Sequence, residues 1–161
     1  MPHMFADICR SKGTDVEVTM LAHGGKGWDF HIEEPEVRFN ILYGGYDTVV
    51  LQHTAHPMGD LAVMSQSGEK LIQWVREAGA QPVLYMTWTT KSDGEEAQEY
   101  MSNAYRMLQA KTGCILAPVG ERWWQYHREH PDEELYAQDG QHASSVGSQL
   151  AAAVIAEAVL S

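Results

Sequence analysis

The chain has 161 residues, which is enough for one domain with a proper core but short for two. Hydrophobic residues make up 44% and charged residues 20%, as is ordinary for a globular protein. The formal net charge of −11, with no local cluster of lysine and arginine, argues against a nucleic-acid partner or an anionic membrane surface. No apolar stretch approaches the roughly 20 residues of a membrane span.

No basic segment followed by an apolar one opens the sequence, so no secretory leader is predicted. We therefore expect a cytoplasmic protein if the chain starts where its gene starts, whereas a fragment could have lost such a leader. Cys9 and Cys114 lie far apart in the sequence, and two free thiols in a reducing compartment are the expected state.

The periodicity of apolar residues predicts helices and strands that alternate along the whole chain. In chain order these are a helix over 1–12, a strand over 15–21, a helix over 35–42, a strand over 47–52, a helix over 61–78, a strand over 81–88, a helix over 95–111, a strand over 114–119, and helices over 121–130 and 144–160. Such alternation indicates a single α/β domain over 1–161, with a mainly parallel sheet covered by helices on both faces.

Polar loops follow several predicted strands at the sheet edge where α/β proteins bind ligands. They cover 23–28, 52–57 and, beyond the last strand, 139–142. The first loop is rich in glycine but lacks the spacing and the Lys-Ser/Thr pair of a phosphate loop, so nucleotide binding is rejected. Its glycines indicate either a turn that needs positive φ or a backbone N–H presented to an oxyanion, and spacing alone leaves both open.

The third loop places an acid three residues ahead of a histidine, in Asp139-Gly140-Gln141-His142. A carboxylate at this spacing can hold an imidazole in one tautomer and so prepare a general base. The alternative is a helix N-cap followed by a surface histidine. Ser144 and Ser145 are better suited to capping the last helix than to catalysis, and no serine lies in a glycine-flanked turn after a strand.

Two histidine pairs, His53 with His56 and His127 with His130, have a spacing compatible with zinc ligation. Zinc also needs a third ligand, which the sequence does not identify, so we expect neither a metal nor another cofactor. His56 is instead interpreted as a hydrogen-bonding residue at the mouth of an active site. The tryptophans at 88, 123 and 124 are expected in the core or in a pocket lining.

Four segments in succession resemble blocks of the SGNH (GDSL-like) hydrolases, most closely the bacterial branch whose third strand ends in Leu-Gln. The Asp-x-x-His block is the most specific of them, and the likeness runs along essentially the whole chain. The segments are Tyr46-Asp47-Thr48-Val49-Val50-Leu51-Gln52, Val83-Leu84-Tyr85-Met86-Thr87-Trp88, Ala117-Pro118-Val119-Gly120, and Leu135-Tyr136 with Asp139-Gly140-Gln141-His142, Ser145 and Gly147-Ser148.

The resemblance implies a flavodoxin-like three-layer α/β/α sandwich and hydrolysis of small acyl esters, lipids or acylated carbohydrates. It assigns Asp139 and His142 to the catalytic triad and places a backbone oxyanion donor at Gly24 or Gly25, with Gly25 preferred. Gln52 stands where the family usually has an asparagine as its second oxyanion donor. This assignment is weaker because the family's Gly-x-Asn-Asp motif is absent.

The family also has a first strand and a Gly-Asp-Ser or Gly-Asn-Ser turn that carries the nucleophile, and this sequence contains neither. We expect the catalytic serine upstream of Met1, little or no esterase activity from residues 1–161, and a sheet missing its usual first strand. The exposed strand edge favours a homodimer. The alternatives are a non-catalytic ligand-binding protein and a histidine-based metal hydrolase.

Overall fold

The strands form a parallel sheet, described here in a computed structural model that covers all residues from Met1 to Ser161. Its three strands lie in the order β1-β2-β3 and span Thr48–Gln52, Gln81–Tyr85 and Ile115–Ala117. In the parallel register Val50 lies opposite Val83, which in turn lies opposite Ile115. The strands predicted over 47–52, 81–88 and 114–119 are confirmed, although each is shorter at one or both ends.

Seven helices surround this sheet, and several begin with recognisable N-terminal signals. Asp60 caps one helix by accepting hydrogen bonds from the N–H groups of Ala62 and Val63, and the Ser144 hydroxyl caps another by accepting from Gly147. The helices are α1 (Pro2–Ser11), α2 (Trp28–His31), α3 (Pro35–Tyr43), α4 (Leu61–Glu77), α5 (Gly94–Thr112), α6 (Val119–Glu129) and α7 (Ser145–Val159).

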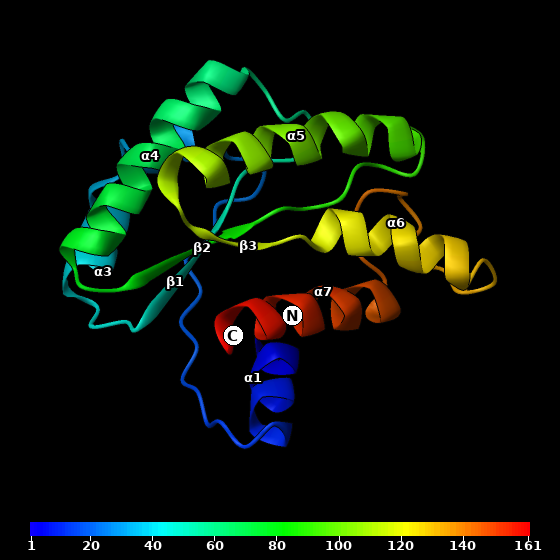
Figure 1. The fold of residues 1–161 in the computed structure, drawn as a ribbon, viewed down its shortest axis with the longest axis horizontal. Coiled ribbons are helices and arrows are strands. Elements are labelled where there is room, and N and C mark those ends of the chain that lie inside the picture. Colours follow the sequence, from blue (N-terminus) through cyan, green and yellow to red (C-terminus); the bar gives the residue numbers. More distant parts are fainter.

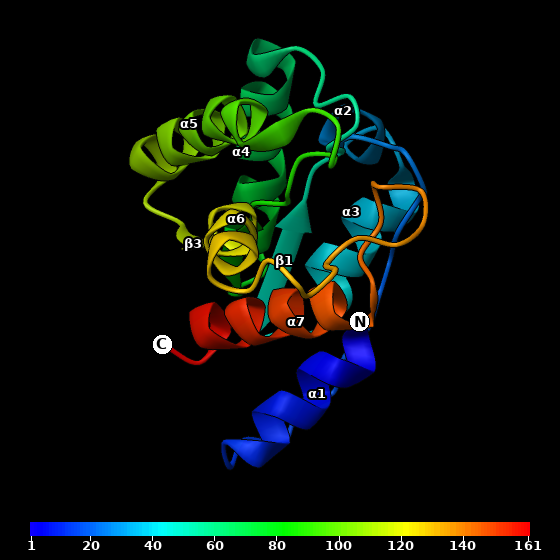
Figure 2. The same ribbon diagram turned by 90° about the vertical axis from the view of Figure 1, so that its right-hand side faces the viewer.

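The alternation of side chains along β2 divides the interior into two apolar cores. Leu84 faces the larger core, which contains 18 buried residues and lies under α3, α4 and α5. Val83 and Tyr85 face the opposite way, into a core of 8 buried residues shared with α7. Figure 1 shows α4 and α5 on one side of the sheet and α1 and α7 on the other, and Figure 2 shows α6 between α5 and α7. The predicted three-layer α/β/α sandwich is confirmed.

The outer edge of β1 has no neighbouring strand. Its only pairing is with β2, and Val50 keeps 37% of its surface exposed. The strand predicted over 15–21 is wrong, because this segment runs extended and makes no backbone–backbone hydrogen bond. Its apolar residues stay open to solvent, with Met20 69% exposed. A strand forms only beside a partner, and neither this segment nor the edge of β1 has one on that side.

None of the helices combines the length and the apolar character that crossing a bilayer requires. Cys9 and Cys114 are both buried and free, as the sequence predicts. Cys9 lies in α1, whereas Cys114 directly precedes β3.

Candidate functional site

The Asp-x-x-His segment forms the tip of a small antiparallel hairpin between α6 and α7. Tyr136 and Ala143 form an isolated antiparallel bridge, and the N–H of Ala137 donates to the carbonyl of His142 at 2.8 Å. The turn closes through Gly140, whose φ of +68° is readily adopted only by glycine. The hairpin thereby fixes the backbone that carries Asp139 and His142.

Asp139 and His142 are in direct contact. The Asp139 Oδ2 atom lies 2.6 Å from Nδ1 of the imidazole. The other carboxylate oxygen accepts hydrogen bonds of 2.9 Å from the backbone N–H groups of Gln141 and His142. The sequence spacing predicts this pairing because a turn of three residues returns the chain toward the carboxylate.

This contact fixes the imidazole tautomer by elimination. An ionised carboxylate can only accept hydrogen bonds, so Nδ1 of His142 must carry the proton that lies between the two groups. In the neutral ring the lone pair then belongs to Nε2. The side chain is 83% exposed, so Nε2 points into open space. The geometry is that of an oriented base with a free proton-accepting atom.

Hydrogen bonds lower the pKa of Asp139 to about 2, the largest cause being the bond from the His142 side chain and the next the two backbone N–H groups. We predict that His142→Ala raises the pKa of Asp139 part of the way toward its ordinary value, because the backbone donors remain. Carboxyl ¹³C NMR titration measures this shift, with His130→Ala as the control. An unchanged pKa in His142→Ala would contradict the pairing.

The hairpin is anchored to the segment that follows β2. The indole N–H of Trp88 donates to the Gln141 carbonyl at 2.9 Å, and the N–H of Lys91 donates to the Gly140 carbonyl at 2.8 Å. The buried Tyr136 hydroxyl donates to the Thr89 carbonyl at 2.8 Å. Burial is the main reason that the pKa of Tyr136 rises to about 12, so this hydroxyl stays protonated as a donor.

Sequence reasoning did not identify these anchoring contacts. Backbone acceptors leave no pattern in the residue types, so only the position of Trp88 just after a strand could have suggested a role near the site. The prediction that the tryptophans lie in the core or line a pocket describes Trp123 and Trp124 well, since they are 0% and 8% exposed. Trp88 is partly exposed and stacks on Trp123, with ring centroids 4.1 Å apart.

Gly25 and Gln52, the predicted oxyanion donors, make no hydrogen bond to Asp139 or His142. Gly25 lies in an exposed turn before α2 with φ of +69°, and its N–H has no acceptor within the chain. Gln52 ends β1 with its amide side chain exposed and without a partner. Both groups are therefore free to donate to a bound ligand, and their role at an oxyanion stays a prediction.

His56 lies on the loop after β1, in an open hollow of about 400 Å³. Gln141, the neighbour of His142, also lines this hollow, so the hollow adjoins the Asp139–His142 pair. Partial burial is the main reason that the pKa of His56 falls below its ordinary value, with the nearby His142 acting in the same direction and Asp93 opposing it. The role of His56 at the mouth of an active site stays a prediction.

His53, the other member of the His-x-x-His pair, has a structural role. Its Nδ1 accepts from the N–H of Trp28 at 3.0 Å, and its Nε2 lies 2.9 Å from the Met58 carbonyl. Both ring nitrogens are thus engaged, and no group of three or more histidine, cysteine or acidic side chains is arranged to hold a metal ion. The arrangement gives the metal-hydrolase alternative no support.

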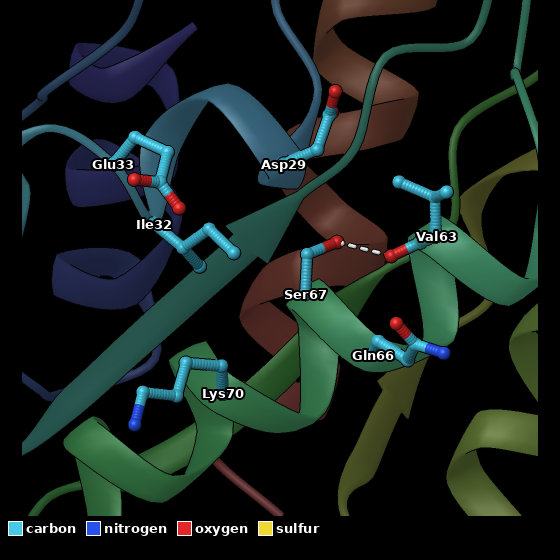
Figure 3. Close-up of a pocket in the computed structure, with 7 residues that line it drawn as sticks. All are labelled: Asp29, Ile32, Glu33, Val63, Gln66, Ser67 and Lys70. Carbon is cyan, nitrogen blue, oxygen red and sulfur yellow. Dashed lines mark hydrogen bonds between the residues drawn. The ribbon is translucent and has the colours of Figure 1, made fainter.

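A second hollow of about 350 Å³ lies away from this hairpin, between α4 and the segment around α2 (Figure 3). Ser67 lines it, but its hydroxyl donates to the Val63 carbonyl of its own helix at 2.6 Å. Asp29, Glu33 and Lys70 supply charge, and no histidine is present to act as a base. The hollow beside His142 is therefore the better candidate site.

Neither a protein-family profile nor a curated protein matches the sequence. The fold does match solved structures. A candidate SGNH hydrolase from Slackia heliotrinireducens aligns with 98% of this chain and 91% of its own length, at 29% identity and a TM-score of 0.79. The resemblance of the sequence to the SGNH hydrolases is confirmed by this match.

Two further structures share the SGNH fold at lower identity. TesA aligns with 98% of this chain and 86% of its own, at 14% identity and a TM-score of 0.74. The acetyl xylan esterase AlAXEase aligns with 98% of this chain and 89% of its own, at 18% identity and a TM-score of 0.76. These two matches establish the architecture alone.

Proposed function

We propose that this SGNH chain carries the acid–base half of an ester hydrolase. In this proposal His142 is the general base, Asp139 orients it, and the N–H of Gly25 and the amide of Gln52 are oxyanion donors. The observation that carries the proposal is the 2.6 Å contact between Asp139 and His142, which leaves Nε2 free and outward. The proposed substrates are small acyl esters or acylated carbohydrates, in keeping with the acetyl xylan esterase of the same fold.

The proposed reaction is acyl transfer in two balanced steps. Nε2 of His142 takes the proton of an attacking hydroxyl, whose oxygen bonds to the ester carbonyl carbon, and the carbonyl oxygen becomes an oxyanion. The imidazolium then returns that proton to the departing alcohol as the ester C–O bond breaks. Water repeats the sequence on the acyl intermediate, which releases the acid and regenerates the hydroxyl. Asp139 stabilises the imidazolium in both steps.

Residues 1–161 place no nucleophilic hydroxyl beside His142. No serine, threonine or tyrosine hydroxyl hydrogen-bonds His142, and Ser144 is occupied with the Glu134 carbonyl and the Gly147 N–H. We propose that a β-strand beside β1 delivers it. Such a strand would pair with the open edge of β1. If it led into α1, it would end next to Met1. The Met1 sulfur lies 3.9 Å from the Tyr85 hydroxyl, which places that end at the carboxyl edge of the sheet.

Hydrolysis of p-nitrophenyl acetate tests the assignment, with and without such a strand and with His142 intact or replaced. Activity that needs both the strand's serine and His142 supports the esterase. Binding of ligands without any His142-dependent turnover in the strand-bearing form would favour the non-catalytic alternative. Turnover abolished by a chelator would favour the metal hydrolase.

The same open edge underlies the proposed homodimer. An uncovered strand without charged or proline residues readily pairs with another chain, and β1 reads Thr-Val-Val-Leu-Gln. We predict that residues 1–161 self-associate and that Val50→Lys reduces the association about tenfold or more, as measured by sedimentation velocity. Val63→Lys is the matched control, because Val63 is 44% exposed but lies on helix α4. Equal self-association of both variants would argue against pairing through β1.

A further inference from the structure

The hollow beside the Asp139–His142 pair has an unusual charge balance. Asp93, at the start of α5, is its only acidic residue, and no lysine or arginine lines it. The Asp93 carboxylate accepts a 2.6 Å hydrogen bond from the Thr90 hydroxyl, but it forms no ion pair with any cation of the chain. No cationic side chain therefore neutralises it, and only the N-terminal end of the α5 dipole partly offsets its charge.

Neighbouring charges do not change this balance. Lys91 is paired with Glu134, and Arg128 is paired with Glu95 on the first turn of α5. His56 is the other titratable side chain of the lining, and its partial burial favours the neutral imidazole. A ligand in this hollow therefore meets one carboxylate and no lysine or arginine side chain.

The remaining walls of the hollow are apolar or aromatic. Met58 and Met101 are nearly buried at its base, whereas the Tyr100 ring is 58% exposed and borders it. Methionine side chains adapt to the shape of a bound group, and the face of a tyrosine ring attracts cations. A carboxylate, a tyrosine ring and thioether walls together match the chemistry of an alkylated ammonium group.

We infer that this hollow is a subsite for a compact cationic group of the substrate, and that Asp93 determines the preference for that charge. As a statement about substrate, the inference rests on the proposed esterase function. As a statement about binding, it can be tested without any turnover. It adds to the proposed function a substrate class, namely esters whose acyl or alcohol part carries an alkylated ammonium.

Three probes of nearly equal shape and different charge give the test. They are choline, its neutral isostere 3,3-dimethylbutan-1-ol and the anion 3,3-dimethylbutanoate, titrated into residues 1–161 while methionine methyl NMR signals are followed. We expect choline to bind about fivefold more tightly than the neutral alcohol, because one partly exposed ion pair contributes about that much affinity. The anion should bind most weakly. The shifts should centre on Met58 and Met101.

Two isosteric variants test whether the Asp93 carboxylate causes the preference for choline. Asp93→Asn keeps the shape and the Thr90 contact but removes the charge, and it should abolish the preference for choline. Glu96→Gln removes an exposed carboxylate of the same helix outside the hollow and should leave the preference intact. The methyl spectra also show whether each variant is folded. Equal binding of choline and the neutral alcohol, or an unchanged preference in folded Asp93→Asn, would overturn the inference.

The outcome separates this inference from the esterase proposal. Choline binding without His142-dependent hydrolysis in the strand-bearing form would refute the esterase and leave the cationic subsite standing. Hydrolysis without charge preference in the titrations would refute the subsite and leave the esterase standing.

Discussion

An apolar β-strand ending in Gly-x-Ser, joined to the amino end of α1, is expected to raise kcat for p-nitrophenyl acetate by on the order of 10³ or more over residues 1–161. The physical reason is that His142 has an oriented, unoccupied Nε2 atom but no hydroxyl to deprotonate. A strand paired with the open edge of β1 brings a hydroxyl to the edge of the sheet where the Asp139–His142 hairpin lies.

Three controls make this result specific. The same strand ending in Gly-x-Ala should leave turnover at the level of residues 1–161. In the strand-bearing form, His142→Ala should remove the gain, whereas His130→Ala should retain it, because His130 is an exposed histidine at the end of α6. An equal, His142-dependent rate from residues 1–161 alone would refute the need for a delivered hydroxyl.

Trp123→Ala is expected to lower the free energy of unfolding by about 3–5 kcal/mol, as is typical when a buried tryptophan is truncated. Trp123 is 0% exposed, stacks on Trp88 at 4.1 Å and contacts Tyr136 edge-on at 5.1 Å. Its ring also fills the space over Gly147, where any Cβ atom would collide with it. Removing the ring therefore leaves a cavity between α6, α7 and the Asp139–His142 hairpin.

Urea denaturation followed by circular dichroism measures this loss. Tyr43→Ala is the control, because that aromatic side chain is 76% exposed and its removal should cost at most about 0.5 kcal/mol. A loss below about 1 kcal/mol in Trp123→Ala would mean that the aromatic cluster does not hold the hairpin in place.

Much of the fold is predictable from the sequence because apolar periodicity is a local signal. The all-apolar run before Gln52 and the long amphipathic pattern over 61–78 correspond to β1 and α4 within a residue at each end. The segment over 15–21 has equally good strand periodicity and nevertheless forms no strand. Pairing depends on a neighbouring chain segment, which a local pattern does not reveal.

The candidate site likewise combines features that the sequence could predict with features that it could not. The contact between Asp139 and His142 follows from a spacing of three residues, so the sequence could predict it. The anchoring bonds from Trp88 and Lys91 reach backbone carbonyls about 50 residues away, and carbonyls are present at every position. The position of Asp93 in the hollow could not be predicted for a related reason. No local sequence pattern indicates that a carboxylate at the start of a helix faces the loop at 55–58.

In the proposed esterase, the anchoring of the hairpin would orient the imidazole before the nucleophile arrives. Asp139 and His142 are held by bonds to the segment after β2 and by packing on α6, and none of these contacts involves the outer edge of β1. The entropic cost of orienting the imidazole is therefore met when the domain folds, before any nucleophile arrives. An incoming hydroxyl would meet a preorganised proton acceptor at high effective molarity. The only remaining entropic cost would be that of ordering the hydroxyl itself.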